Sequence, residues 1–215
     1  MGNVIGVMGD SGSGKTTAMR NLDPKSTMYV DCDKKGLSWK GWKKEFNAEN
    51  KNYIVTDLPG MALTILKTVN SAKEYKHIKV IVFDTINGLM VADEMRRMKE
   101  KNYDKWIDLA SSIYDLVDEA LITREDLTVI FVAHTQTEQD ESGYMFTHIK
   151  TSGRKLDKIV LESKMNTVLL AKCRNGQYVF ETQSNRSTAK SPFGLLDDKE
   201  IPNDITTVIK AFEEF

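Results

Sequence analysis

Cysteines and long apolar runs are both scarce in this sequence, and each scarcity narrows the possible classes of protein. Cys32 and Cys173 are the only cysteines among 215 residues, and neither lies in a Cys-x-x-Cys motif or a Cys/His cluster. The default interpretation is two reduced, largely packed thiols. No apolar run approaches the roughly 18 residues that a membrane-spanning helix needs. The first residues also lack the charged-then-apolar pattern of a signal peptide. We therefore expect a cytoplasmic protein with no membrane partner.

The sequence also lacks an excess of charge of either sign. Lys and Arg number 30, Asp and Glu number 31, and the formal net charge is −1. Any nucleic-acid site must therefore come from local clustering of basic residues. Such a cluster exists between Lys150 and Lys190, a stretch that contains nine Lys or Arg residues and only three Asp or Glu residues. No internal repeat, low-complexity tract or linker is visible, so residues 1–215 are expected to form a single domain.

The most informative stretch is Gly9-Asp10-Ser11-Gly12-Ser13-Gly14-Lys15-Thr16. It fits the pattern G-x-x-x-x-G-K-[ST], in which backbone N–H groups surround phosphates and the lysine contacts the β- and γ-phosphates. A short apolar strand, 4–8, precedes it, and Lys15 to Asn21 is predicted to begin a helix whose N-terminus favours an anion. The pattern predicts that ATP, with Mg²⁺, is bound by Gly9, Asp10, Ser11, Gly12, Ser13, Gly14, Lys15, Thr16 and Thr17.

Acidic residues follow two further predicted strands. Residues 26–31 form one, which ends at Asp31-Cys32-Asp33, and residues 78–85 form a near-continuous β-branched run that contains Asp84. Asp84 is the expected magnesium partner of the Thr16 hydroxyl. For Asp31 and Asp33, a role at a site and a role as solvated acids both remain open. A strand over 127–133 delivers His134 to the same edge, where it could sense a γ-phosphate.

The rest of the chain alternates between helices and strands. Trp39 and Trp42 favour a short amphipathic helix that buries both rings, although the lysines around them also fit a stacking surface. Residues 135–157 are polar and without periodicity, which predicts a functional or disordered loop. Asn175-Gly176 predicts the turn of a hairpin. The remaining expected elements are a strand over 52–56, a helix over 59–72 with Met61, Leu63, Ile65 and Leu66 buried, two helices within 86–123, and a last helix after Pro202-Asn203-Asp204.

In this order the motifs resemble the ATPase core of the RecA family, and more closely the phage-encoded RecA-like ATPases grouped with single-strand annealing proteins. The resemblance rests on Gly9–Thr16, Asp31–Asp33, Val80–Thr85, Ala133-His134, and the segments 188–192 and 201–204. It implies an α/β fold: a RecA-like P-loop NTPase core with a mostly parallel central sheet flanked by helices and a C-terminal β-hairpin. It also implies an ATPase that binds single-stranded DNA, supports recombination, annealing or replication, and self-associates as a ring or filament, with a phage single-strand-binding protein as a possible partner.

The resemblance further implies roles for individual residues. Lys15, Asp33, Asp84, His134 and Lys190 would be catalytic. Asp33 would polarise the attacking water, His134 would link the γ-phosphate to DNA, and Lys190 or Arg186 would reach a neighbouring subunit's nucleotide. The DNA-binding loop would span residues 137–157 and use Tyr144, Phe146, Lys150, Arg154 and Lys155.

Two other classes of function remain open from the sequence. A nucleotide-type kinase can begin with the same phosphate loop, although no compact arginine-rich lid follows the helices. A nucleotide-dependent assembly switch for a replication partner needs no substrate at all. Stimulation of turnover by single-stranded DNA, by nucleosides, or by neither would separate the three classes.

Overall fold

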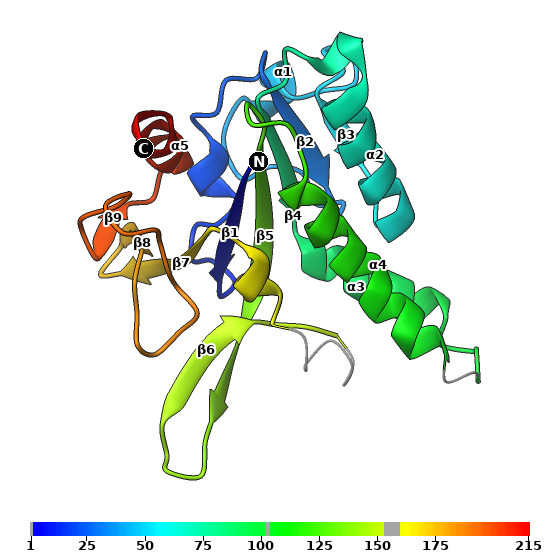
Figure 1. Ribbon diagram of the computed structural model, residues 1–215. Coiled ribbons are helices and arrows are strands. Elements are labelled where there is room, and N and C mark those ends of the chain that lie inside the picture. The colour runs from blue at the N-terminus through cyan, green and yellow to red at the C-terminus, as the bar shows by residue number, and fades with distance from the viewer. Residues whose placement is uncertain (1, 102–103, 153–159) are drawn as a thin grey trace.

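The computed structural model describes residues 2–101, 104–152 and 160–215 (Figure 1). Its sheet has the strand order β3-β2-β4-β5-β1-β7-β8-β9, with β6 paired to the far end of β5. The six strands from β3 to β7 in this order run parallel, and β8 is antiparallel to both of its neighbours. The α/β fold with a mostly parallel sheet, predicted from the sequence, is confirmed. The strands are β1 (Asn3–Gly9), β2 (Thr27–Asp31), β3 (Tyr53–Val55), β4 (Val80–Asp84), β5 (Thr128–Gln139), β6 (Met145–Ile149), β7 (Thr167–Arg174), β8 (Gln177–Glu181) and β9 (Glu200–Pro202).

Helices cover both faces of the sheet, which explains why its central strands are apolar on both sides. In β1, Val4 and Met8 face one core, whereas Ile5 and Val7 face the other. The first core lies under α2, α3 and α4, and the second lies under α5 on the opposite side (Figure 1). The helices are α1 (Trp42–Glu45), α2 (Pro59–Ser71), α3 (Ile86–Arg96), α4 (Asp104–Leu121) and α5 (Ile205–Glu214), with short 3-10 turns η1 (Thr17–Met19), η2 (Lys73–Tyr75) and η4 (Leu161–Lys164).

The helix predicted over Lys15 to Asn21 is shorter than expected. Only η1 forms, because the amides of Met19 and Arg20 bond to carbonyls three residues back and the chain turns away at Asp23-Pro24 to enter β2. Arg20 and Asn21 instead point to the start of α5, where they bond to the Asn203 carbonyl and the Asp204 carboxylate. The phosphate loop is thus followed by one turn that is fixed to the C-terminal helix.

The packing interpretation of the two tryptophans is confirmed, although their helix covers only Trp42–Glu45. Both rings are partly buried against the second core. The Trp39 ring meets Phe46 edge-on at 6.0 Å, and the Trp42 ring lies 5.2 Å from that of Tyr53. These aromatic side chains cover the second core at the edge of the sheet formed by β2 and β3.

Several local predictions agree closely with the structure. The hairpin of β7 and β8 turns at Asn175 and Gly176, both with positive φ, as a two-residue loop requires. Asp204 caps α5 by accepting a hydrogen bond from the Thr206 amide at 3.0 Å. The α2 helix ends one residue earlier than predicted, and Met61, which was expected inside, is exposed.

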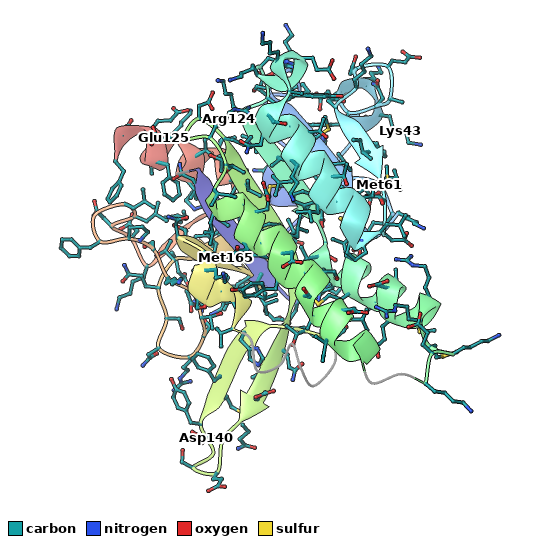
Figure 2. The ribbon with its side chains drawn as sticks, turned by 45° about the vertical axis from the view of Figure 1, so that its right-hand side comes forward. Lys43, Met61, Arg124, Glu125, Asp140 and Met165 are labelled. Carbon is teal, nitrogen blue, oxygen red and sulfur yellow. The ribbon has the colours of Figure 1, made fainter. Side chains whose placement is uncertain are left out.

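The loop predicted over residues 135–157 was wrong for its first part. Residues 135–139 continue β5 and pair with β6 in an antiparallel ribbon, from Thr135 opposite Ile149 to Gln139 opposite Met145. We call residues 135–149 the ribbon. Residues 135–139 are polar on both faces, and the apolar residues of β6 (Met145, Phe146 and Ile149) do not alternate with polar ones, so neither strand has a hydrophobic period that could have indicated it. Figure 2 shows Asp140 at the ribbon's tip, projecting away from the sheet.

Candidate nucleotide-binding site

The carboxyl ends of four adjacent parallel strands bring the predicted site residues to one edge of the sheet. Gly9 of β1 lies opposite His134 of β5, and Asp84 of β4 lies opposite Val132 of β5 and Asp31 of β2. Ligands of open α/β sheets bind at this edge. The charges of Asp33 and Asp84 act on the pKa values of both Lys15 and His134, so the structure brings these four residues together.

The phosphate loop depends on glycine at two points. Gly12 and Gly14 have φ of 79° and 91°, a left-handed conformation that favours glycine. A Cβ on Gly14 would also lie 2.7 Å from the ring of Tyr178 and 3.1 Å from Oδ1 of Asn203. The loop is therefore packed from outside by β8 and by the residue before the α5 cap.

The Lys15 side chain folds over its own loop. Its Nζ donates to the carbonyl oxygens of Gly9 and Asp10, each at 2.7 Å. An ammonium group has three N–H donors, so one remains for a phosphate oxygen. Burial lowers the pKa of Lys15 to about 8, with Lys35 acting in the same direction and Asp84 opposing it.

Asp84 is buried, and its two oxygens are not equivalent. Oδ2 accepts a hydrogen bond from the Tyr29 hydroxyl at 2.6 Å, whereas Oδ1 has no hydrogen-bond partner among the described residues. Burial raises the pKa of Asp84, while Lys35, Tyr29 and the nearby Thr16 hydroxyl oppose that rise. A buried carboxylate oxygen is costly to leave unpaired, which makes Oδ1 a ready ligand for a cation.

These residues fit a magnesium ion bound together with a nucleotide. The described residues contain no group of three or more His, Cys, Asp or Glu side chains that could enclose a metal by themselves. Mg²⁺ commonly takes one or two carboxylates and completes its shell with water and substrate phosphates. Asp84 Oδ1 and the Thr16 hydroxyl would supply the protein's share.

Asp31 and Asp33, which the sequence left unassigned, have different surroundings. The Asp31 carboxylate accepts hydrogen bonds from the amides of Asp33 and Gly36, at 3.2 and 2.8 Å, and from the Tyr53 hydroxyl at 2.7 Å. It is buried and shapes the loop. Asp33 is partly exposed and accepts from the Thr85 hydroxyl at 3.0 Å and the Lys35 ammonium at 2.7 Å.

Gly88 allows the Asp33 loop to approach α3. A Cβ there would lie 2.4 Å from Oδ1 of Asp33 and 2.5 Å from the carbonyl oxygen of Cys32. Neither atom could move without displacing Asp33 from the site edge. The close contact therefore holds Asp33, the residue expected to polarise the attacking water, in its position.

His134 was predicted to end its strand, but it lies within β5, at the point where the strand leaves the core. Its backbone amide donates to Oδ1 of Asn87 at 2.7 Å. Burial lowers the pKa of the imidazole, and Lys15 lowers it further. The ring is therefore neutral near pH 7 and can donate a hydrogen bond to a phosphate oxygen.

Two hollows open beside these residues. One of about 360 Å³ is bordered by Asp33, Asn87, Gly88 and His134. The other, of about 450 Å³, lies between the phosphate loop and one face of the ribbon, and its lining includes residues 10–13, Thr135, Thr137 and Thr147. The Thr135 hydroxyl donates to the Asp10 carboxylate across this second hollow. The ribbon thus touches the phosphate loop directly.

Lys190 does not belong to the group around Lys15. Its backbone pairs with Val168 of β7, and its partly buried side chain lies close enough to Glu162 for that carboxylate to affect it. Burial lowers the pKa of Lys190, and Glu162 opposes the shift. Arg186, by contrast, is exposed on the segment that pairs with β6.

The residues predicted to bind DNA are only partly described. Tyr144 lies just before β6 and Phe146 lies within it; both are exposed, and the Tyr144 hydroxyl donates to the Asn185 carbonyl. Lys150 follows the ribbon, whereas Arg154 and Lys155 lie outside the described residues. The ribbon itself carries Glu138, Asp140 and Glu141 and no lysine or arginine.

Five residues that approach the site were missed as site residues. Tyr29, Asn87 and Tyr178 make contacts that link distant parts of the chain, so no local pattern could have indicated them. Lys35 was noted only as one lysine of a basic run. Asn203 was recognised only before the helix cap, yet its side chain is buried beside the phosphate loop and its Nδ2 has no partner among the described residues.

Comparison with known proteins agrees with this geometry. A family model described as an AAA domain matches residues 1–193. No curated protein matches the chain. In the described part of the chain, no helix combines the length and the apolar character needed to cross a membrane. The phosphate loop, the parallel sheet and this match together show that the chain belongs to the AAA-domain family of P-loop ATPases.

Proposed function

We propose that this protein binds ATP with Mg²⁺ and hydrolyses it at the carboxyl edge of β1, β4 and β5. One observation carries the proposal: Lys15, Asp33 and His134 surround a buried Asp84 whose Oδ1 has no hydrogen-bond partner among the described residues. Transfer of a phosphoryl group to water requires a cation that contacts the phosphates, a base near the attacking water and a ligand for the metal ion. Lys15, Asp33 and Asp84 are the candidates for these three roles.

Each residue has a distinct task in this proposal. Lys15 holds the β- and γ-phosphates with the N–H that its loop leaves free. Asp33 accepts a hydrogen bond from the attacking water and orients it toward the γ-phosphate, while neutral His134 donates to a γ-phosphate oxygen. A bound Mg²⁺ would neutralise charge on the phosphate oxygens. The Lys35 ammonium forms an ion pair with the Asp33 carboxylate at 2.7 Å and helps to orient it.

The test is Mg²⁺-dependent release of phosphate from ATP by wild-type protein and by Lys15→Ala. We expect the variant to lose nucleotide binding, because Lys15 is the cation that the loop itself encloses. Lys25→Ala, at an exposed lysine after the first turn, is the matched control and should behave as wild type. Transfer of phosphate to a nucleoside would favour a kinase. Binding without any turnover would favour an assembly switch.

A second proposed function is binding of single-stranded DNA in support of annealing, recombination or replication, and a specific groove favours it. The groove, of about 1080 Å³, lies between the β7–β8 hairpin and the segments 183–191 and 199–200. Five basic and two acidic residues line it: Lys172, Arg174, Arg186, Lys190 and Lys199, with Glu181 and Glu200. Ion pairs with the acids occupy Lys172 and Arg174, whereas Arg186 and Lys199 form none among the described residues.

This groove is a better location for phosphates than the ribbon tip, which is acidic. Arg186→Ala with Lys199→Ala should weaken binding of oligo-dT and reduce its logarithmic salt slope by roughly 0.7 for each lost contact. Neutralising Glu138 and Glu141 is the matched control and should not weaken binding. Absence of oligo-dT binding by wild type at low salt, with ATP present, would remove DNA from the proposal while leaving ATP hydrolysis intact.

We also propose self-association in which a cation from one subunit completes a neighbour's site. Arg186 suits this role better than Lys190, because it is exposed while Lys190 is partly buried near Glu162. A cation supplied in trans can be worth about 10³-fold in rate. Arg186→Ala and Lys15→Ala should each be inactive alone and should partly restore ATPase activity when mixed. Wild-type turnover by Arg186→Ala would contradict the assignment, and the same pair of measurements with Lys190→Ala tests the alternative.

A further inference from the structure

Asn87 closes a ring of three hydrogen bonds at the base of the ribbon. Its Oδ1 accepts from the His134 amide at 2.7 Å, and its Nδ2 donates to the Lys150 carbonyl at 2.7 Å. The Lys150 amide in turn donates to the His134 carbonyl at 2.8 Å. The ring therefore joins the residue where β5 leaves the core to the first residue after β6.

The position of Asn87 explains why a side chain does this work. β4 pairs with β5 only as far as Asp84 opposite Val132, and the chain then turns into α3 at Ile86. Beyond that point, the β5 backbone has no β4 backbone to bond with on that side. The Asn87 amide, on the first turn of α3, replaces it. Asn87 is buried, so both of its polar groups need these partners.

We propose that Asn87 is a positioning residue that couples the ribbon to the phosphate end of the site. It holds His134 beside Lys15 and Asp33 and, through the same amide, holds the start and the end of the ribbon. A change at the ribbon therefore moves His134, and occupancy of the phosphate site in turn restrains the ribbon. This inference rests on the proposed function: its kinetic consequence needs ATP hydrolysis, whereas its structural consequence needs only binding of the nucleotide.

The ribbon also contacts the site through a second residue, Thr135, and the effect of that contact must be distinguished from the effect of Asn87. The Thr135 hydroxyl donates to Asp10 of the phosphate loop, so a response of the ribbon to nucleotide could travel by that path. The two paths differ in what they hold. Thr135 contacts the loop, whereas Asn87 contacts His134 and Lys150.

The kinetic test compares Asn87→Ala with Asn52→Ala. Asn52 is also a buried asparagine, and its side-chain amide donates to the carbonyls of Pro24 and Glu45, away from the site. We expect both variants to lose thermal stability, but only Asn87→Ala to lower kcat, by about 10- to 100-fold, with the KM for ATP changed by less than about threefold. Equal kcat values for the two variants would overturn the positioning role.

The structural test uses hydrogen exchange of the ribbon amides with and without a non-hydrolysable ATP analogue and Mg²⁺. In wild type, the analogue should slow exchange over residues 135–149 by about fivefold or more. Asn87→Ala should abolish this slowing, and so should Asn87→Asp, which keeps the acceptor for His134 but loses the donor to Lys150. Thr135→Val should retain it.

The two tests have separate outcomes. Undiminished slowing in both Asn87 variants, or its loss in Thr135→Val alone, would place the coupling at Asp10 and overturn the inference. Asn87→Asp keeps the test available if Asn87→Ala does not fold. If wild-type protein never releases phosphate but binds the analogue and protects its ribbon, and Asn87→Ala loses that protection, the proposed hydrolysis is refuted while the coupling through Asn87 is supported.

Discussion

The two halves of β5 lie in contrasting surroundings. Residues 128–133 are buried between β1 and β4, with the Phe131 ring stacked at 5.5 Å on that of Phe83. Residues 135–139 pair with β6 alone and become exposed toward the tip. The first half is fixed by apolar burial on two faces, and the second by hydrogen bonds. One strand therefore contains both a rigid support for the site and a segment that can respond to a ligand.

Apart from Ile149, which is buried in the first core, the contacts that hold the ribbon are mainly polar. Besides its own ladder, they include the Asn87 ring, the Thr135–Asp10 bond, the Tyr144–Asn185 bond and the pairing of Thr147 with Arg186 and Thr188. Segments of this kind open at a lower free energy than core strands. The comparison shows that a rigid segment that supports the site and a segment that opens more easily can follow each other within one strand.

The largest expected effect lies in the buried half. Phe131→Ala should lower the free energy of unfolding by about 3–5 kcal/mol, because it removes a fully buried ring that the surrounding sheet cannot replace. Urea denaturation followed by circular dichroism measures the loss. A loss below about 1 kcal/mol would mean that this half of β5 is not the rigid support described above.

The next effect concerns the two acids at the carboxyl end of β2, Asp31 and Asp33. Asp33→Asn should preserve binding of Mg²⁺-ATP but slow turnover by about 10²-fold or more, because the amide cannot take a proton from water. Asp31→Asn, which leaves the water-orienting carboxylate in place, should mainly reduce stability by disturbing the loop that Asp31 holds together. Single-turnover phosphate release and analogue titration separate the two outcomes. Unchanged turnover in Asp33→Asn would leave the base unassigned.

A smaller effect follows from the lowered pKa of Lys15. Phosphates bind the ammonium form, and in the free protein that form is lost as the pH rises through about 8. Binding above that pH must take up a proton, so the Kd for ATP should rise by up to about tenfold per pH unit. Below pH 8 the Kd should be flat with respect to this group. Fluorescent-analogue titrations from pH 7 to pH 9.5 measure the slope.

A matched variant checks the source of that slope. Lys15→Arg keeps its charge at every pH in this range. Its affinity, even if weaker throughout, should therefore not change with pH. A wild-type Kd that stays constant up to pH 9.5 would contradict the lowered pKa of Lys15.

The smallest effect on stability is expected in the exposed half of the comparison. Phe146 is 37% exposed on the ribbon, and Phe146→Ala should change the free energy of unfolding by no more than about 0.5 kcal/mol. The same denaturation experiment as for Phe131→Ala makes the two phenylalanines directly comparable. A loss similar to that of Phe131→Ala would show that the ribbon packs as a core element.

Much of the fold could be predicted because its signals are local. The buried strands appear as apolar runs, the β7–β8 turn as Asn175-Gly176, and the start of α5 as Asp204. The ribbon could not be predicted, because Thr135 to Gln139 alternate one polar side chain with another. The short turn after the phosphate loop also escaped prediction, since its length is set by contacts with Asn203 and Asp204 that lie far along the chain.

The candidate site divides in the same way. Lys15 and Asp84 follow from motifs, and the structure places both at the expected edge. Asp31 and Asp33 could be distinguished only in the structure, because their surroundings depend on the hydroxyls of Tyr53 and Thr85, which lie far away in the sequence. Asn87 could not be found from sequence, since its partners lie 47 and 63 residues away.

Because β5 continues without interruption into the ribbon, it determines which ribbon side chains face the phosphate loop and which face away from it. Side chains alternate along a strand, so Thr135 and Thr137 face the phosphate loop, whereas Gln136 and Glu138 face the other way. Removing one residue at the start of the ribbon, such as Thr135, would exchange the two sets and direct the carboxylate of Glu138 toward the phosphate loop. Removing two residues would shorten the ribbon and keep its phase. Evolution of the ribbon's length is therefore expected to proceed in pairs of residues.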